Sequence, residues 1–93
     1  MLSQIPIKIE KIERKILDRE ILRVAIIAEL DAINLYEQLA AATDNENIRK
    51  VLLEVAREEK THVGEFQALL LGEDAEQTEE LDKGRKEVEE IIG

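Results

Sequence analysis

The fold is decided by a stretch near the middle of the chain, Ala56-Arg57-Glu58-Glu59-Lys60-Thr61-His62. Residues at spacings of three and four lie on one side of a helix and form a stripe. The stripe that contains this stretch consists of Ile48, Leu52, Val55, Glu59, His62, Phe66 and Leu69. The apolar members of this stripe are what an amphipathic helix buries, so Glu59 and His62 are expected to face a core. Burying a carboxylate is costly unless its charge is compensated. The sequence must therefore supply a compensating group.

The composition predicts one small all-α domain. The chain has 93 residues, of which 38% are charged and only 2% aromatic, and Leu and Ile dominate its apolar fraction. The absence of cysteine excludes disulfides, zinc–thiolate sites and thiol catalysis.

The net charge of -9 disfavours binding to nucleic acid and to an anionic membrane surface. The chain starts without a basic segment followed by an apolar one, and no apolar run approaches the roughly 18 residues of a membrane span. We therefore expect a soluble, cytoplasmic protein with no nucleic-acid or membrane partner.

The pattern divides the chain into an N-terminal arm (1–17), a helical hairpin (18–72) and a C-terminal tail (73–93). The arm begins with alternating isoleucines around Pro6, which indicates extended structure. Asp18 is the predicted N-cap of a first long helix over 19–42.

The hairpin turn is predicted at Thr43-Asp44-Asn45-Glu46, which has the spacing of a capping box with Thr43 as N-cap and Glu46 reaching back. A second helix is expected over 46–71, ended by Gly72. Such a short connection makes the two helices antiparallel neighbours.

The tail is predicted to hold a weaker third helix. Asp74 begins it, it runs toward Lys83, and Gly84 interrupts it before a short helix over 85–92. With so few large apolar residues, the tail is not expected to form a core helix.

The first helix carries its own stripe with one acid in it. Its members are Leu22, Ile26, Glu29, Ile33, Tyr36 and Ala40. When two helices run antiparallel, the residue numbers of each facing pair add up to the same value. This rule places Glu29 opposite Glu59, one layer from His62. The helix also has more apolar surface than one partner helix can cover, which favours a homo-oligomer.

A Glu on one helix, facing Glu-x-x-His on its neighbour, is half of a carboxylate-bridged dinuclear metal site. Oxygen-rich coordination with one His per metal suits iron or manganese better than zinc or copper. One chain supplies only Glu29, Glu59 and His62, so two chains related by a two-fold axis would complete the site. Two divalent ions would neutralise the four carboxylates of such a dimer.

The alternative is a structural polar layer in which Glu29, Glu59 and His62 fix the register of a helical dimer. Tyr36, on the same stripe, is either a neighbour of the metal ligands or a core residue. The remaining acids near the stripe are interpreted as solvated side chains: Asp31, Glu37, Glu58 and Glu65.

The stretches Ala28-Glu29-Leu30-Asp31-Ala32-Ile33-Asn34-Leu35-Tyr36 and Glu58-Glu59-Lys60-Thr61-His62 resemble the encapsulated ferritins, most closely the domain fused to archaeal encapsulin shell proteins. The resemblance implies a two-helix hairpin with a short third helix, two chains forming a ferritin-like four-helix bundle, and a decameric ring inside an encapsulin nanocompartment. It also implies a di-iron ferroxidase centre (Fe2+/Fe3+) held by Glu29, Glu59 and His62 of each chain.

The sequence departs from this family at three places. The family has carboxylates at a secondary iron site, where this chain has Ala28 and Asp31, so Asp31 alone is the candidate there. Leu35 replaces the family's tryptophan, whereas the tyrosine is retained as Tyr36. Nothing after Val88 resembles the peptide by which standalone members dock into the shell.

The function predicted is a ferroxidase that oxidises Fe(II) with dioxygen and supplies Fe(III) for mineralisation and storage inside the compartment. Two alternatives remain open. One is a non-catalytic oligomerisation module, and the other is a rubrerythrin-like di-iron peroxidase. The lack of cysteine counts against the peroxidase, because many rubrerythrins use a thiolate-bound electron-transfer iron.

Overall fold

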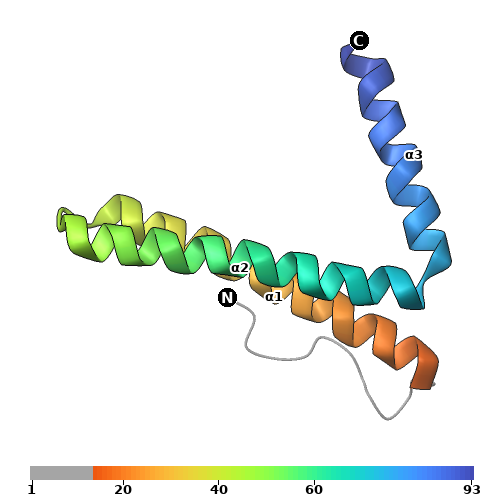
Figure 1. Ribbon diagram of the computed structural model, residues 1–93, viewed down its shortest axis with the longest axis horizontal. Helices are drawn as coiled ribbons and strands as arrows, with labels where there is room; N and C mark the ends of the chain where they lie inside the picture. The colour runs from red at the N-terminus through yellow and green to blue at the C-terminus, as the bar shows by residue number, and fades with distance from the viewer. Residues whose placement is uncertain (1–13) are drawn as a thin grey trace.

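Two long antiparallel helices and a third helix make up the structure, a computed structural model that describes residues 14–93. They are α1 (Arg14–Ala42), α2 (Glu46–Glu73) and α3 (Ala75–Ile92) (Figure 1). No strand occurs in the described range, so the all-α prediction is confirmed. Residues 1–13, which form most of the predicted arm, lie outside that range. No helix within it is long and apolar enough to cross a membrane.

The start of α1 differs from the prediction. Residues 14–18 are already helical, so Asp18 lies inside the helix and is not its N-cap. Leu17, in the turn before Asp18, is only 6% exposed. Continuing the helix before Asp18 therefore adds apolar burial that a cap at that position would forgo.

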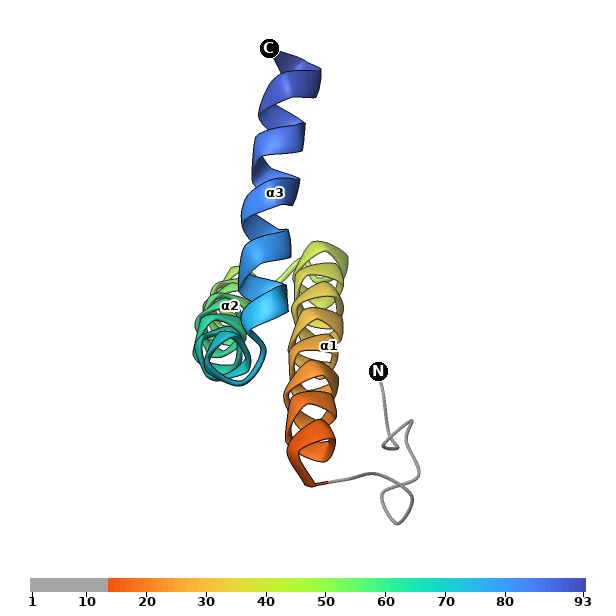
Figure 2. The same ribbon diagram turned by 90° about the vertical axis from the view of Figure 1, so that its right-hand side faces the viewer.

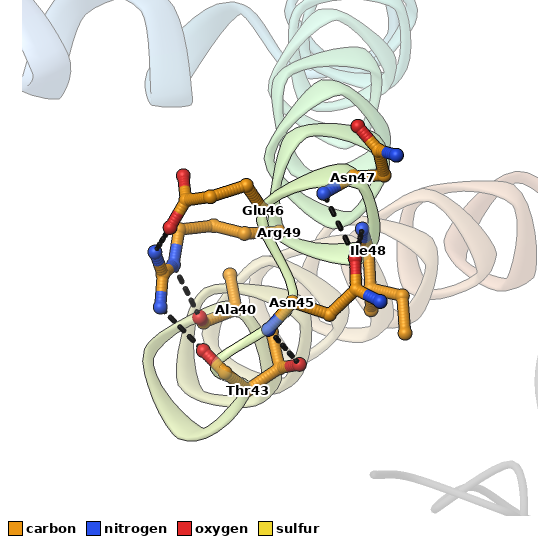
Figure 3. Close-up of polar contacts among 7 residues, drawn as sticks. All are labelled: Ala40, Thr43, Asn45, Glu46, Asn47, Ile48 and Arg49. Atoms are coloured by element: carbon orange, nitrogen blue, oxygen red, sulfur yellow. Dashed lines mark hydrogen bonds and ion pairs between the residues drawn. The ribbon is translucent and has the colours of Figure 1, made fainter.

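The turn between α1 and α2 is capped by a different residue from the one predicted (Figure 3). The Asn45 side chain accepts hydrogen bonds from the backbone N–H groups of Asn47 and Ile48. The Thr43 hydroxyl accepts instead from the Asn45 N–H, and Glu46 pairs with Arg49. The hairpin forms as predicted, but its N-cap is Asn45, because the oxygen of its side-chain amide accepts from two unpaired N–H groups at once.

Arg49 joins the two helices at this end of the hairpin. Its Nε donates to the Ala40 carbonyl at 3.1 Å, and its guanidinium also donates to the Thr43 carbonyl (Figure 3). The last carbonyls of a helix have no partner within it. A side chain of α2 therefore satisfies the end of α1.

The end of α2 also lies later than predicted. The helix passes through Gly72, which keeps an ordinary helical φ, and ends at Glu73. Asp74 is the one residue between α2 and α3, and its side chain accepts a hydrogen bond from the Gln77 N–H. The prediction that Asp74 begins the third helix is confirmed, whereas the stop at Gly72 is wrong.

The third helix is continuous through Gly84, contrary to the predicted interruption. A glycine inside a helix costs only about 1 kcal/mol. Ion pairs at helical spacing offset part of that cost on both sides of Gly84: Glu80 with Lys83, Asp82 with Arg85 and Lys86, and Arg85 with Glu89.

The described chain buries little of its apolar surface. Its core residues are Leu17, Ala32, Ile33, Ala40, Ala56 and Leu70, and no large described side chain is less than 2% exposed. The radius of gyration is 16.7 Å, against about 12 Å for a compact domain of this length. Figures 1 and 2 show the reason: α1 and α2 form a single layer, and α3 projects away from it. The single chain therefore leaves much of its apolar surface exposed, as expected for a small chain with only one layer of paired helices.

Candidate metal centre

The three residues that the sequence places opposite one another come together in the structure. Glu29 comes from the middle of α1, and Glu59 and His62 come from adjacent turns of α2. One potential ligand atom of each lies within 4.8 Å of the others. His62 Nδ1 is 3.3 Å from Glu59 Oε2 and 3.5 Å from Glu29 Oε2. In the described range this is the one group of three or more ionisable side chains arranged to hold a metal ion.

The group is open on one side. The side chains of Glu29 and Glu59 are each 19% exposed, whereas that of His62 is 44% exposed. His62 was expected to face a core, and in the single chain it lies at the rim. The reason is that α1 lies along only one side of α2 (Figure 2), so that nothing in the described part of the chain covers the other side of α2.

The glutamates have the environment of metal ligands. Glu29 Oε2 is buried and accepts no hydrogen bond from the described residues. A buried carboxylate oxygen left in this way is costly, and a bound cation would compensate its charge. Lys60, beside Glu59 in the sequence, does not do so, because its Nζ pairs with Glu37 at 3.2 Å. Two carboxylates and one imidazole fit iron or manganese.

The other residues singled out in the sequence lie apart from this group or at its edge. Asp31 is partly buried but is not among the grouped ligands, because side chains two residues apart point to different sides of a helix. Its role in a secondary iron site stays a prediction. Tyr36, two turns after Glu29, is partly buried on the same face, and its neighbour Leu35 is 36% exposed.

Sequence reasoning missed a second polar cluster, at the base of the hairpin. There Arg23 of α1 pairs with Asp74 at 2.9 Å, and Arg19 donates to the Glu73 carbonyl. A signal was present. Arg19 and Arg23 are four residues apart near the start of α1, and an antiparallel hairpin brings that region to the end of α2.

The chain is similar to known proteins along most of its length. The sequence pattern of the rubrerythrin family matches residues 20–91. A ferritin-like–encapsulin shell fusion protein of Pyrococcus furiosus is 68% identical over 74 residues, which are 80% of this chain and 21% of that protein. The encapsulin nanocompartment cargo protein EncC of Myxococcus xanthus is 44% identical over 69 residues, 71% of this chain and 53% of that protein.

A solved structure matches the fold as well. The crystal structure of the encapsulated ferritin domain from Pyrococcus furiosus has a TM-score of 0.84 and 57% sequence identity, over 98% of this chain and 93% of that domain. The chain thus corresponds to nearly all of that domain, but to about a fifth and about half of the two full-length relatives.

Proposed function

Because this chain is an encapsulated ferritin domain of the rubrerythrin family, we propose that two copies form a ferroxidase that oxidises Fe(II) to Fe(III) with dioxygen. The observation that carries this proposal is the half-open group of Glu29, Glu59 and His62, with its buried carboxylate oxygen and its exposed imidazole. One copy would contribute three ligands, and the second copy would contribute the same three.

The apolar surface beside the group supports a two-fold arrangement. Val51 and Leu69 lie eleven residues before and seven after His62, so both share its side of α2, and they are 64% and 60% exposed. An open hollow of about 400 Å³ at the hairpin tip is lined by Asn47, Ile48, Val51 and Leu52. A second hollow, of about 240 Å³, is lined at the base by Asp18, Ile21, Leu22, Leu69 and Glu73.

Along α2, the two hollows lie on opposite sides of the pair Glu59 and His62. Leu52 lies seven residues before Glu59, and Leu69 lies seven residues after His62. An axis passing between Glu59 and His62, perpendicular to α2, would therefore set the tip of one copy against the base of the other. The same axis would bring the two half-sites together and cover both apolar hollows.

Charge neutralisation would link iron binding to assembly. The four glutamates of a dimer carry four negative charges, which two Fe(II) ions would neutralise. Without iron, the dimer interface would hold these carboxylates uncompensated. Iron that binds between two chains therefore favours the dimer by mass action.

Each side chain would have a distinct role. Glu29 and Glu59 would hold iron through their carboxylate oxygens, and His62 would hold it through a neutral imidazole nitrogen at the rim. Bound iron would supply the electrons that dioxygen accepts. The net charge of -9 would raise the local concentration of Fe(II) around the protein.

Storage would need more than this chain. An L-shaped chain with one helical layer encloses no compartment in which a mineral could grow. One relative is a fusion with an encapsulin shell, and another is an encapsulin cargo protein. We therefore propose an encapsulin shell as the partner and the interior of that nanocompartment as the location, with the dimers assembled into a decameric ring.

Native mass spectrometry of metal-free protein, titrated anaerobically with Fe(II), tests the proposal. We expect even-numbered assemblies to grow as one iron per chain is retained, and Glu29→Ala to retain no iron. After exposure to air, the parent protein should oxidise Fe(II) and the variant should not. An assembly state indifferent to iron, with none retained, would make the three residues a structural layer.

Peroxide is the second candidate oxidant, since the family pattern that matches is that of rubrerythrin. The same loaded protein should be mixed with hydrogen peroxide in place of dioxygen, with and without a reductant. Turnover that requires peroxide and a reductant would replace the ferroxidase proposal. Oxidation by dioxygen alone supports it.

A further inference from the structure

The bend between α2 and α3 is centred on one residue, and a hydrogen bond from the Thr78 hydroxyl to the Leu71 carbonyl, at 3.4 Å, also crosses it. Asp74 is the single non-helical residue between Glu73 and Ala75, and its side chain is only 10% exposed. One carboxylate oxygen accepts a hydrogen bond from the Gln77 N–H at 3.1 Å. The other accepts from the Arg23 guanidinium at 2.9 Å. The carboxylate therefore caps α3 and fastens its start to α1.

A second arginine holds the residue before the bend. Arg19 Nε donates to the Glu73 carbonyl at 2.9 Å, which is one of the carbonyls that the end of α2 leaves without a helical partner. Arg19 and Arg23 are four residues apart, so they lie one above the other on α1. Together they hold both sides of the bend. We call Arg19, Arg23 and Asp74 the elbow clamp.

Apolar packing does not hold α3 in place. The helix has no buried residue. Its large apolar side chains are exposed by 44% to 81%: Leu81, Val88, Ile91 and Ile92. Beyond its first turn α3 leaves the hairpin altogether (Figures 1 and 2). In a typical helix pair, the buried apolar stripe sets the crossing angle, and that determinant is missing here.

We propose that the elbow clamp sets the direction of α3, so that releasing Arg19 and Arg23 from Glu73 and Asp74 frees the helix to change its angle to the hairpin. The sequence allows that change. No proline separates α2 from α3, and helical backbone at Asp74 would join them into one longer helix. The clamp therefore selects the bent form of an element that has a second arrangement available.

The electrostatics keep the clamp closed near neutral pH. The hydrogen bond from the Gln77 N–H lowers the pKa of Asp74 below its ordinary value, and the guanidinium of Arg23 and the charge of Arg19 lower it further. The carboxylate is therefore ionised throughout the neutral range, and both arginines carry permanent positive charges.

Distances between spin labels on α2 and α3 test the proposal directly. The chain has no cysteine, so Gln67→Cys and Glu87→Cys, both at exposed positions, label one site on each helix. Metal-free labelled protein is diluted with unlabelled protein, so that only distances within one chain are measured. With the clamp intact we expect one narrow distribution. Arg19→Gln with Arg23→Gln should broaden it at least two-fold.

Arg57→Gln is the matched control, because Arg57 makes an exposed pair with Glu54 inside α2 and touches no bend. Its distance distribution should equal that of the parent. An unchanged narrow distribution in the double variant would overturn the proposal. The measurement uses no iron, so its result is independent of whether the ferroxidase proposal holds.

A second variant separates release of the clamp from loss of the helix. Asp74→Asn keeps an oxygen that can cap α3 but loses the charge that pairs with Arg23. With helix content unchanged by circular dichroism, we expect an intermediate broadening. A distribution equal to that of the parent would show that the ion pair does not hold the bend, and would overturn the proposal even if the double variant unfolds.

Discussion

Glu29 has a buried carboxylate oxygen, Oε2, that accepts no hydrogen bond from the described residues. We therefore expect Glu29→Gln to leave the metal-free protein as stable as the parent, or more stable by up to about 1 kcal/mol. The stabilisation that Fe(II) gives to the parent should disappear in the variant. Urea unfolding with a chelator, and anaerobically with Fe(II), measures both effects.

Glu65→Gln is the control for that change, because Glu65 lies exposed on α2, the helix that carries Glu59 and His62. It should keep the full stabilisation by Fe(II). A marked loss of stability in metal-free Glu29→Gln would mean that the charge is structural, and would count against its role as a ligand.

Arg49 stabilises the hairpin through several guanidinium N–H groups that donate at the same time. It donates to the Ala40 and Thr43 carbonyls at the end of α1 while pairing with Glu46. Arg49→Lys keeps the charge but cannot bond all three groups. We expect a loss of about 1–3 kcal/mol in the free energy of unfolding, measured in urea with a chelator.

Arg57→Lys, in an exposed pair with Glu54, should stay within about 0.5 kcal/mol of the parent. If the two variants lose equal stability, Arg49 does not owe its effect to the carbonyls of α1.

The grouping of Glu29, Glu59 and His62 could be predicted from sequence because helical spacing fixes it, whereas their role as metal ligands stays a proposal. Glu29, Glu59 and His62 interrupt two apolar stripes that match layer for layer, and that match needs no knowledge of side-chain geometry. Arg49 and Asp74 were not assigned their contacts in advance. Arg49 donates to backbone carbonyls and Asp74 accepts from a backbone N–H, and the pattern of side chains does not say which backbone groups a helix end leaves unpaired.

At the scale of one helix, Gly84 in α3 has room for a side chain. A Cβ built there meets no atom within 4 Å, and the residue has no left-handed φ. Gly84→Ala should therefore stabilise α3 by about 0.5–1 kcal/mol. Thermal melting followed by circular dichroism checks this, with a higher midpoint expected.

Gly64 in α2 is the informative comparison, because it too is helical and has nothing within 4 Å of a built Cβ. In a single chain the gain should be the same at both positions. A gain at Gly84 without one at Gly64 would mean that another copy approaches α2 there. No gain at either position would contradict the helix-propensity argument.

The elbow clamp should make the free energy of unfolding depend on pH in the acid range. The pKa of Asp74 is lowered in the folded protein, first by the Gln77 N–H and then by Arg23. The folded state therefore favours the ionised form of Asp74, and this ionisation contributes to the free energy of unfolding. This contribution is complete well above 3.8, the ordinary value for Asp, and is lost as the pH falls through the lowered pKa.

Comparison with Asp74→Asn isolates this effect from the titration of the other carboxylates. The parent should be the more stable protein at pH 6, and the difference in unfolding free energy should shrink as the pH falls below 3.8. A difference that stays constant over this range would show that the ionisation of Asp74 contributes nothing.

The presence of three helices and the antiparallel pairing of the first two could be predicted from sequence. The residues at which the helices begin and end were harder to predict. Asp74 was identified as the start of α3, but Asp18, Thr43 and Gly72 were assigned to ends that lie elsewhere. In each case a residue that commonly ends helices competes with burial or with a better cap nearby. Leu17 and Asn45 decide two of these cases.

For the whole molecule, the exposed side of α2 that carries His62 is where assembly should be sensitive. Val51 is 64% exposed on that side, and Leu53 is 46% exposed on the opposite side, nine residues before His62. Val51→Lys should weaken the iron-loaded dimer at least ten-fold, because it places a charge in the proposed apolar contact. Dissociation constants from sedimentation with Fe(II) check this.

Leu53→Lys adds the same charge on the far side and should leave iron-dependent dimerisation unchanged. Equal weakening by both variants would mean that the two-fold axis does not pass beside His62. The apolar surface that α1 leaves exposed could be predicted from sequence, because the helix has more of it than one neighbouring helix covers. The projection of α3 could not, because it depends on the contacts of a single bend.

The open rim at His62 has a kinetic consequence. The proposed ferroxidase, assembled from two such halves, would have a specific activity that rises with protein concentration, because the rate in a dilute solution would follow the square of the chain concentration. Separate chains would then leave Fe(II) unreacted, and oxidation would be confined to places where the chain is crowded. Iron oxidation by dioxygen can yield reactive oxygen species. The incomplete site would thus restrict this reaction to the proposed compartment, where its products are contained.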